Sequence, residues 1–240
     1  MRHSTSKEVR ERQKRDRIGE ETLNNQGCLM RIVEYNNSKD IVVEFQDEYK
    51  ARINSRYPEF KSGGIRNPYH PVICGVGMIG MKYGAAINKK TTKEYYTWKN
   101  MLYRCYNEEY KKRYNTRQDL VCCEEWLCFE NFYDWIHSQS NCKNFLEGNN
   151  WILSVDVIDK NNNIFSPQTC YLIPQNINAL FFTDKRLNAW NVNELVLQRY
   201  KEYRKSHIKR IAKEEFEKNN ITEQCYMAMM DYKVDLQGEK

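Results

Sequence analysis

Two aspartates and an asparagine in the second half of the chain have the types and spacing to hold a metal ion. Asp156 and Asp159 end a stretch that we interpret as a β-strand, a polar turn follows at 161–163, and Asn178 lies beyond a second predicted strand. Carboxylate and carboxamide oxygens suit Mg²⁺ and Mn²⁺. With a base that activates water, such a metal hydrolyses phosphodiesters. The spacing predicts a nuclease-like site with Asp156, Asp159 and Asn178 as candidate catalytic residues and Asp156 and Asn178 as candidate metal ligands.

The general base is the weak point of this site, because the stretch 154–181 contains no histidine. His137, at the end of a predicted helix, and Asp159 are the remaining candidates. A carboxylate with an ordinary pKa is a weak base near neutral pH, and a histidine at a helix C-terminus is often there for its favourable charge. The residues therefore predict the layout of a nuclease with little or no cleavage activity.

Two aromatic helices are expected to position this site. A helix starting at Lys93 places apolar side chains on one face, and the stretch 120–137 carries an aromatic stripe at helical spacing. The first face consists of Tyr95, Trp98, Met101, Leu102 and Cys105, and the second of Trp126, Phe129, Phe132, Trp135 and Ile136. Burial preferences favour core positions for these aromatics over a base-stacking surface.

The segment before these helices is rich in β-type patterns. The runs at 28–35 and 40–45 are joined by NNSK, which indicates a hairpin. The glycine-rich stretch 72–87 suggests short, bent strands. Residues 19–90 are therefore expected to form a small antiparallel β module.

Three sequence blocks in a fixed order resemble phage-borne His-Asn-His (HNH) endonucleases: YTWKNMLYRCYN at 96–107, VCCEEWLCFENFYDW at 121–135 and VDVIDKNNNIFSPQTCYLIPQNIN at 155–178. The resemblance implies a strand, strand and helix module with Asp156 as metal ligand and Asn178 as the helix residue that completes metal binding. It also implies a histidine base where Val157 stands. We therefore expect a degenerate active site that takes no cofactor, or Mg²⁺ or Mn²⁺ if it is active.

Positive charge gathers in two segments that flank a mildly acidic body. Residues 1–17 and 185–213 are strongly basic within a chain of net charge +6, a pattern that favours phosphate binding. The alternative is that both are solvated helix faces. The candidate nucleic-acid-binding residues are Arg12, Arg15, Arg199, Arg204, Lys205, Lys209, Arg210 and Lys213.

Composition sets the remaining limits. With 240 residues and 40% hydrophobic side chains, the chain can build real cores. It lacks an apolar run of the ~18 residues that a membrane span needs, so we expect a cytoplasmic protein without a membrane partner. Nine scattered cysteines indicate reduced thiols. A zinc site at Cys122, Cys123, Cys128 and Cys142 is the alternative, although the CxxC spacing typical of such sites is missing.

Together these patterns predict an α+β fold, in which a small antiparallel β module precedes an HNH-like strand, strand and helix module with flanking helices. The expected divisions are a basic arm at 1–18, the β module at 19–90, the HNH-like module at 91–190 and a basic helix and tail at 191–240. The leading functional hypothesis is a catalytically inactive protein that binds double-stranded DNA. The alternatives are a weak metal-dependent nicking endonuclease and a protein-binding inhibitor of a DNA-targeting host defence complex.

Overall fold

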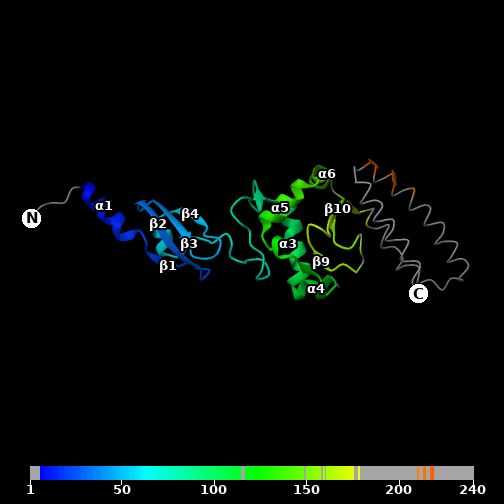
Figure 1. Cartoon of the computed structure of the whole chain (residues 1–240), viewed down its shortest axis with the longest axis horizontal. Coiled ribbons are helices and arrows are strands. Elements are labelled where there is room, and N and C mark those ends of the chain that lie inside the picture. The colour runs from blue at the N-terminus through cyan, green and yellow to red at the C-terminus, as the bar shows by residue number, and fades with distance from the viewer. Residues whose placement is uncertain are drawn as a thin grey trace, which may run out of the picture. The chain divides into compact units, whose positions relative to one another are not determined.

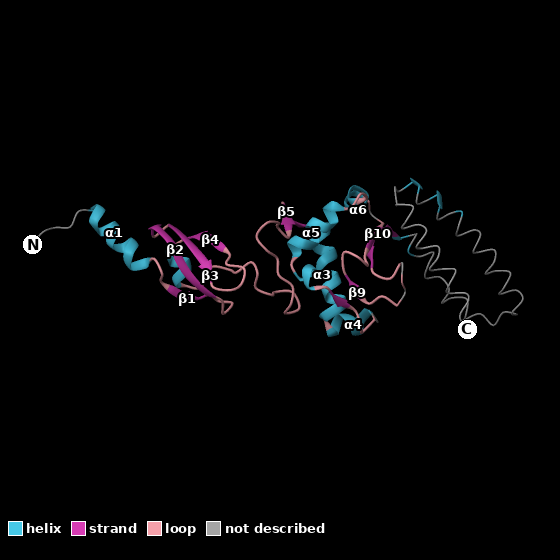
Figure 2. Cartoon of the chain, in the orientation of Figure 1, coloured by secondary structure: helices cyan, strands magenta, loops and turns pink. Residues whose placement is uncertain are grey.

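The computed structural model describes residues 6–175 apart from 115, 116, 149, 158 and 160, together with 178, 210, 213, 214, 217 and 218. The chain divides into two compact units, unit 1 at Met1–Gly84 and unit 2 at Ala85–Lys240. Both units contain helices and mainly antiparallel sheets, so the protein is of the α+β class (Figure 1, Figure 2). The division between the units falls six residues before the sequence-based boundary at 90.

Unit 1 is built on one four-stranded antiparallel sheet in the order β1-β2-β3-β4. The strands are β1 (Glu21–Leu23), β2 (Leu29–Asn37), β3 (Asp40–Phe45) and β4 (Arg52–Ser55). Helix α1 (Ser6–Arg17) precedes the sheet and the short α2 (Tyr57–Lys61) follows it. The hairpin predicted from the runs at 28–35 and 40–45 is confirmed by the pairing of β2 with β3.

Alternation of side chains, interrupted by a register shift in β2, explains why this sheet has one buried face. In β3 every second residue is apolar and buried. In β2 the buried residues are Met30, Ile32 and Tyr35, and the register shifts between Ile32 and Glu34. Phe60 from α2 is fully buried against the same face. The resulting core consists of Met30, Ile32, Tyr35, Ile41, Val43, Phe45, Ala51, Phe60 and Ile65.

The glycine-rich stretch 72–87 differs from its prediction. In place of short strands it forms turns with one isolated bridge, Ile73 with Gly77, and only β5 (Ala86–Ile87) pairs with β6 (Lys90–Thr91). Cys74 and Gly75 both have positive φ, 52° and 72°. Two consecutive left-handed residues turn the chain too tightly for a ladder to continue, so the expectation of bent strands across 72–84 was wrong.

Unit 2 is a helical layer with short strands. Its helices are α3 (Lys93–Tyr106), α4 (Glu108–Tyr114), α5 (Phe129–Ser138) and α6 (Cys142–Glu147). A 3₁₀ turn at Glu124–Leu127 directly precedes α5. β8 (Trp151–Ser154) pairs antiparallel with β10 (Tyr171–Pro174). β7 (Val121–Cys122) pairs parallel with β9 (Ile164–Phe165).

The aromatic core predicted for unit 2 is confirmed. Trp98 is fully buried and its indole Nε1 donates to the carbonyl oxygen of Trp126 at 2.7 Å. Phe129, Phe132 and Ile136 of α5 are also fully buried. The stretch 120–137 is not one helix, however, because Cys123 and Cys128 have extended backbone. Its aromatic stripe is assembled from Trp126 in a 3₁₀ turn and from α5.

Within the described residues no helix is long and apolar enough to cross a membrane. The eight cysteines in this part of the chain are free thiols, and Cys105, Cys122, Cys128 and Cys170 are buried. The predicted basic helix at 191–216 lies outside the described residues except for 210, 213 and 214, which are helical.

Candidate functional site

The predicted metal ligands meet around one serine at the end of β8. Ser154 is buried, and its hydroxyl oxygen lies 3.4 Å from Asp156 Oδ1 and 3.3 Å from Asn178 Oδ1. Pairing of β8 with β10 brings the two ends of this segment together, and Asn178 is helical. One hydroxyl has a single hydrogen to donate, so it satisfies only one of these two oxygens at a time. The structure thus brings Asp156 and Asn178 together.

Asp159 has a different position from its predicted partners. It is exposed, and its carboxylate accepts a hydrogen bond from the backbone N–H of Asn161 at 2.8 Å. Asn162 donates from its side-chain nitrogen to the carbonyl oxygen of Val155 at 2.6 Å and so closes the turn. This is the local side-chain pairing typical of Asx turns. Asp159 is therefore used to shape the loop that follows Asp156.

Arg117 is the residue of this site that sequence reasoning missed. Its guanidinium donates to the carbonyl oxygens of Asn162 at 2.9 Å and Asn161 at 3.4 Å, and to the carboxylate of Asp119 at 2.8 Å. The hydrogen bond with Asp119, with smaller effects from the charges of Asp119, Asp156 and Asp159, raises the pKa of Arg117. The arginine thus clamps the loop that follows Asp156. Arg117 lies about 40 residues from this loop in sequence, so no local sequence pattern identifies it as part of the site.

Val157 stands where the resemblance places the base, and it is fully buried. Its side chain belongs to the core of unit 2 together with Val155, which is 2% exposed. A residue at this position therefore faces the interior and not the loop surface.

His137, the alternative base, is held by another part of unit 2. Its Nε2 lies 2.9 Å from Glu94 Oε1, its Nδ1 lies 3.8 Å from the Cys142 sulfur, and its ring stacks on Tyr133 with centroids 4.1 Å apart. All of these partners belong to α3, α5 and α6. Among the described residues, the structure does not bring His137 into contact with Asp156 or Asp159.

The donor set offers little to a metal. No group of three or more His, Cys, Asp and Glu side chains that could hold an ion occurs among the described residues. Asp156 and Asn178 would supply one carboxylate and one amide oxygen, a small set of the kind that holds Mg²⁺ together with waters and substrate phosphates. Burial raises the pKa of the Cys122, Cys123, Cys128 and Cys142 thiols, which disfavours the thiolates that zinc needs. The described residues therefore hold no closed metal centre built from protein ligands alone.

The predicted nucleic-acid-binding residues are only partly described. Arg12 and Arg15 are exposed on α1, and Arg12 forms an open ion pair with Asp16 at 3.7 Å. Arg210 and Lys213 are exposed and pair with Glu214 and Glu217 at 3.8 and 4.0 Å. The predicted contacts Arg199, Arg204, Lys205 and Lys209 lie outside the described residues.

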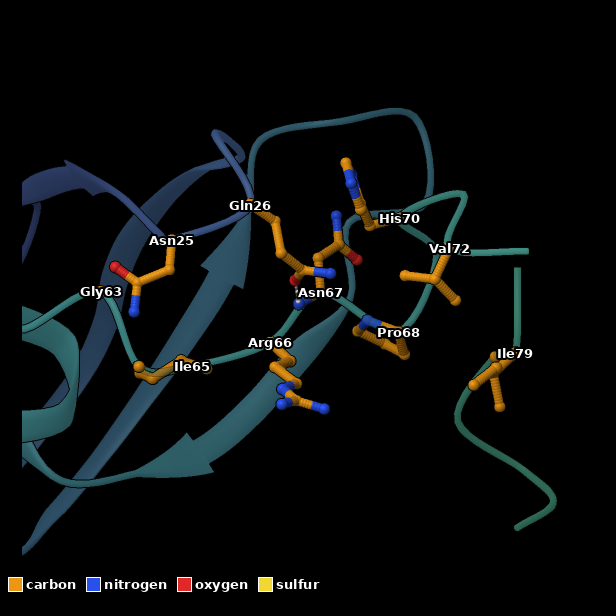
Figure 3. Close-up of a pocket in the computed structure, with 12 residues that line it drawn as sticks. Asn25, Gln26, Gly63, Ile65, Arg66, Asn67, Pro68, His70, Val72 and Ile79 are labelled. Carbon is orange, nitrogen blue, oxygen red and sulfur yellow. Dashed lines mark hydrogen bonds between the residues drawn. The ribbon is translucent and has the colours of Figure 1, made fainter. Parts of the chain in front are cut away.

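Unit 1 contains a cavity of about 580 Å³ that the sequence did not indicate. Figure 3 shows Gln26 lying over Asn67 on one side, with Val72 and Ile79 on the other. The Gln26 side-chain oxygen accepts from the Asn67 backbone N–H at 2.7 Å, which leaves the amide nitrogen as its donor end. Arg66, also on the lining, is exposed and forms no ion pair with a described residue. The residues that line the cavity thus include one arginine and one histidine among neutral side chains.

Comparisons with protein-family models, with curated proteins and with solved structures found no match to this chain.

Proposed function

We propose that the protein binds double-stranded DNA and does not cleave it, on a module laid out like that of the HNH endonucleases it resembles. The observation that carries this proposal is helix α1. Its side chains are exposed from Glu11 to Asp16, and it holds six Lys or Arg residues against three acids. Lys14 and Arg15 form no ion pair with a described residue. Such cations gain energy by releasing counterions from DNA phosphates.

The sheet of unit 1 is a poorer surface for phosphates. Its outward-facing cations are matched by acids on neighbouring strands, Arg31 with Glu21 and Arg52 with Glu44. Paired charges offer a polyanion little net attraction. Within unit 1, phosphate contact is therefore assigned to α1, with the exposed Arg66 beside the cavity as a further cation.

The absence of cleavage rests on the loop after β8. Val157 is buried, Asp159 accepts a hydrogen bond that shapes the turn, and Arg117 clamps the loop. Of these three side chains only the Asp159 carboxylate could take a proton from water, and a carboxylate is a weak base near neutral pH. Losing a general base costs about 10²- to 10⁴-fold in rate, so a scaffold without one serves binding far better than hydrolysis.

The second candidate function is a weak metal-dependent nicking endonuclease. It is favoured by the two oxygens of Asp156 and Asn178 that approach Ser154. In this reading Asp156, Asp159 and Asn178 are catalytic, with His137 or Asp159 as base. No finding tests the third alternative, an inhibitor of a host defence complex, and it stays a prediction.

The proposal is tested by measuring the affinity of the full chain for two unrelated DNA duplexes over a range of salt concentrations. Replacing Arg12, Lys14 and Arg15 together by Ala should weaken binding to both duplexes alike. The slope of log K against log salt should fall by up to about 2.7, since each phosphate contact contributes about 0.9. A matched control removes the same charge elsewhere through Lys39→Ala, Lys90→Ala and Lys143→Ala, three exposed lysines outside α1.

The control should keep the original slope. If the α1 variant and the control behave alike, α1 is not the DNA contact. If the unaltered protein binds neither duplex at low salt, the proposed function is wrong.

A further inference from the structure

A line of three tyrosine rings with a cation at each end runs along α3 and α4 in unit 2. Lys99 Nζ lies 5.2 Å from the ring centre of Tyr103, whose ring lies 5.9 Å from that of Tyr110. The Tyr110 ring in turn lies 4.5 Å from that of Tyr114, and the Arg113 guanidinium lies 5.7 Å from the Tyr114 ring. We call these five residues the tyrosine ridge. Figure 1 shows the two helices that carry it, with α4 directly beyond the end of α3.

The ridge is partly open to solvent and continues along α3. Tyr114 is 57% exposed and Tyr96 is 62% exposed, whereas Lys99, Tyr103 and Tyr110 are half-buried. Tyr96 precedes Tyr103 by seven residues, which is two helical turns, so both stand on the same face of α3 with Lys99 between them. Aromatic side chains of this size are normally covered in a folded protein. Exposed rings at the two ends of this row point to a ligand.

The charge around the ridge selects the class of ligand. Residues 93–114 contain six Lys or Arg and three acids. Lys111 and Glu94 are buried, and Lys93 and Arg104 lie over the rings of Phe145 and Phe165. The surface therefore carries Lys99, Lys112 and Arg113 against Glu108 and Glu109. Lys112 is exposed and forms no ion pair with a described residue. The acids Glu108 and Glu109 lie at the start of α4, and Glu108 is 3.5 Å from Lys111. The surface therefore offers flat rings and a net positive charge together.

We propose that the tyrosine ridge is a binding surface for single-stranded DNA, whose bases stack on Tyr103 and Tyr114 while its phosphates contact Lys99, Lys112 and Arg113. Flat rings flanked by cations match the two features of an unpaired strand, exposed bases and a charged backbone. A DNA duplex presents its bases only as edges in the grooves, so it cannot use the ring faces. The inference takes the nucleic-acid class from the proposed function but does not need α1 or the loop after β8.

The test measures binding of the full chain to a fluorescein-labelled oligo(dT) of about twelve nucleotides, a length within the range of known single-strand sites. Changing Tyr103→Leu and Tyr114→Leu together should weaken this binding by at least about 25-fold, because each of the two bases stacked on a ring contributes about fivefold or more. The double change to Phe keeps the rings and should stay within about twofold of the original affinity. Tyr49→Leu, at a 42% exposed tyrosine of unit 1, is the matched control and should bind as the original protein does.

Two further measurements make the outcome decisive. Tryptophan fluorescence in urea checks that the Leu variant stays folded, since all five tryptophans belong to unit 2. A fully paired duplex should bind the Leu variant and the original protein equally.

Equal oligo(dT) affinity of the Leu variant and the original would overturn the proposal, and so would equal losses in the Leu and Phe variants. Displacement of oligo(dT) by a polyglutamate peptide at the same charge concentration would also overturn it, because charge alone would then explain binding. If duplex binding fails while the ridge variants still lose oligo(dT), the proposed function falls and this inference stands.

Discussion

The loop after β8 and the tyrosine ridge are two polar surfaces of the same unit that use their cations in opposite ways. In the loop, the Arg117 guanidinium is bound to two carbonyl oxygens and to Asp119. In the ridge, Lys99 and Arg113 rest on tyrosine rings. Hydrogen bonds to a charged group are roughly twice as strong as neutral ones, whereas an exposed cation–π contact is worth only about 0.5–1 kcal/mol.

This difference separates a structural role from a binding role. A cation that already has anionic and carbonyl partners loses them when it meets a phosphate, so it gains little from a ligand. A cation on a ring can keep that contact and add a phosphate. The loop that resembles a catalytic site therefore mainly holds its own shape, and the ridge, which no motif marks, is the surface suited to a ligand.

The largest expected effect on stability comes from placing a histidine at position 157, where the resemblance implies a base. Val157→His puts a polar ring into a fully buried position and should lower the free energy of unfolding of unit 2 by about 2–4 kcal/mol. It should not produce strand cleavage. The same change at Val121, which is 41% exposed, is the control and should cost no more than about 0.5 kcal/mol. Tryptophan fluorescence in urea measures both. A stable Val157→His variant that nicks DNA would show that this position faces the loop surface.

The contrast between Arg117 of the loop and Arg113 of the ridge gives the next prediction. Arg117→Ala removes the clamp of the loop and should lower the free energy of unfolding by about 1–2 kcal/mol, a value that allows for the partial exposure of the side chain. Arg113→Ala removes a ridge cation and should change stability by less than about 0.5 kcal/mol while weakening oligo(dT) binding. Urea unfolding and oligonucleotide titration of both variants test this. Equal stability losses would remove the distinction between clamp and ridge.

In unit 1 a cation at the junction of α1 with the sheet is also held by a carboxylate, as Arg117 is in the loop. Removal of this carboxylate gives the smallest expected effect on stability. Arg17 is held by Glu20 at 3.2 Å, and Tyr57 and Lys61 also donate to this carboxylate. Partial burial raises the pKa of Glu20, but the hydrogen bonds from Lys61, Tyr57 and Arg17 outweigh it and lower the pKa below its ordinary value. The stabilisation is therefore present above the unfolded-state pKa and is lost as pH falls through the lower folded-state value.

Glu20→Gln should accordingly destabilise unit 1 by about 1 kcal/mol at neutral pH, and the difference from the original protein should vanish in acid. Hydrogen exchange of β2 and β3 amides across this range measures it in unit 1, which has no tryptophan. A difference that grows as the pH falls would mean that the carboxylate is not stabilised in the folded state.

The sequence predicted the elements whose patterns are local. Alternation identified β2 and β3, and helical spacing identified α3 and the burial of Trp98. The bent strands expected at 72–84 failed because paired positive φ values at Cys74 and Gly75 break the ladder, and glycine content alone does not reveal them.

For the site, the sequence predicted that Asp156 and Asn178 lie close together, but not that Asp159 and His137 lie apart from them. Asp156 and Asn178 do come together, at Ser154, because the pairing of β8 with β10 is set by their apolar patterns. Arg117 was missed because its partners are distant in sequence, and the tyrosine ridge was missed because it joins two helices. Contacts of that kind depend on tertiary packing, which no single-segment pattern contains.

The most direct test of the central claim is to incubate the purified full-length protein with supercoiled plasmid in Mg²⁺ or Mn²⁺ and to follow both mobility and integrity of the DNA. We expect the plasmid to be retarded in a salt-dependent manner and to remain supercoiled after the protein is removed. Metal-dependent conversion to the nicked form that disappears in Asp156→Ala would contradict the account and establish the endonuclease alternative.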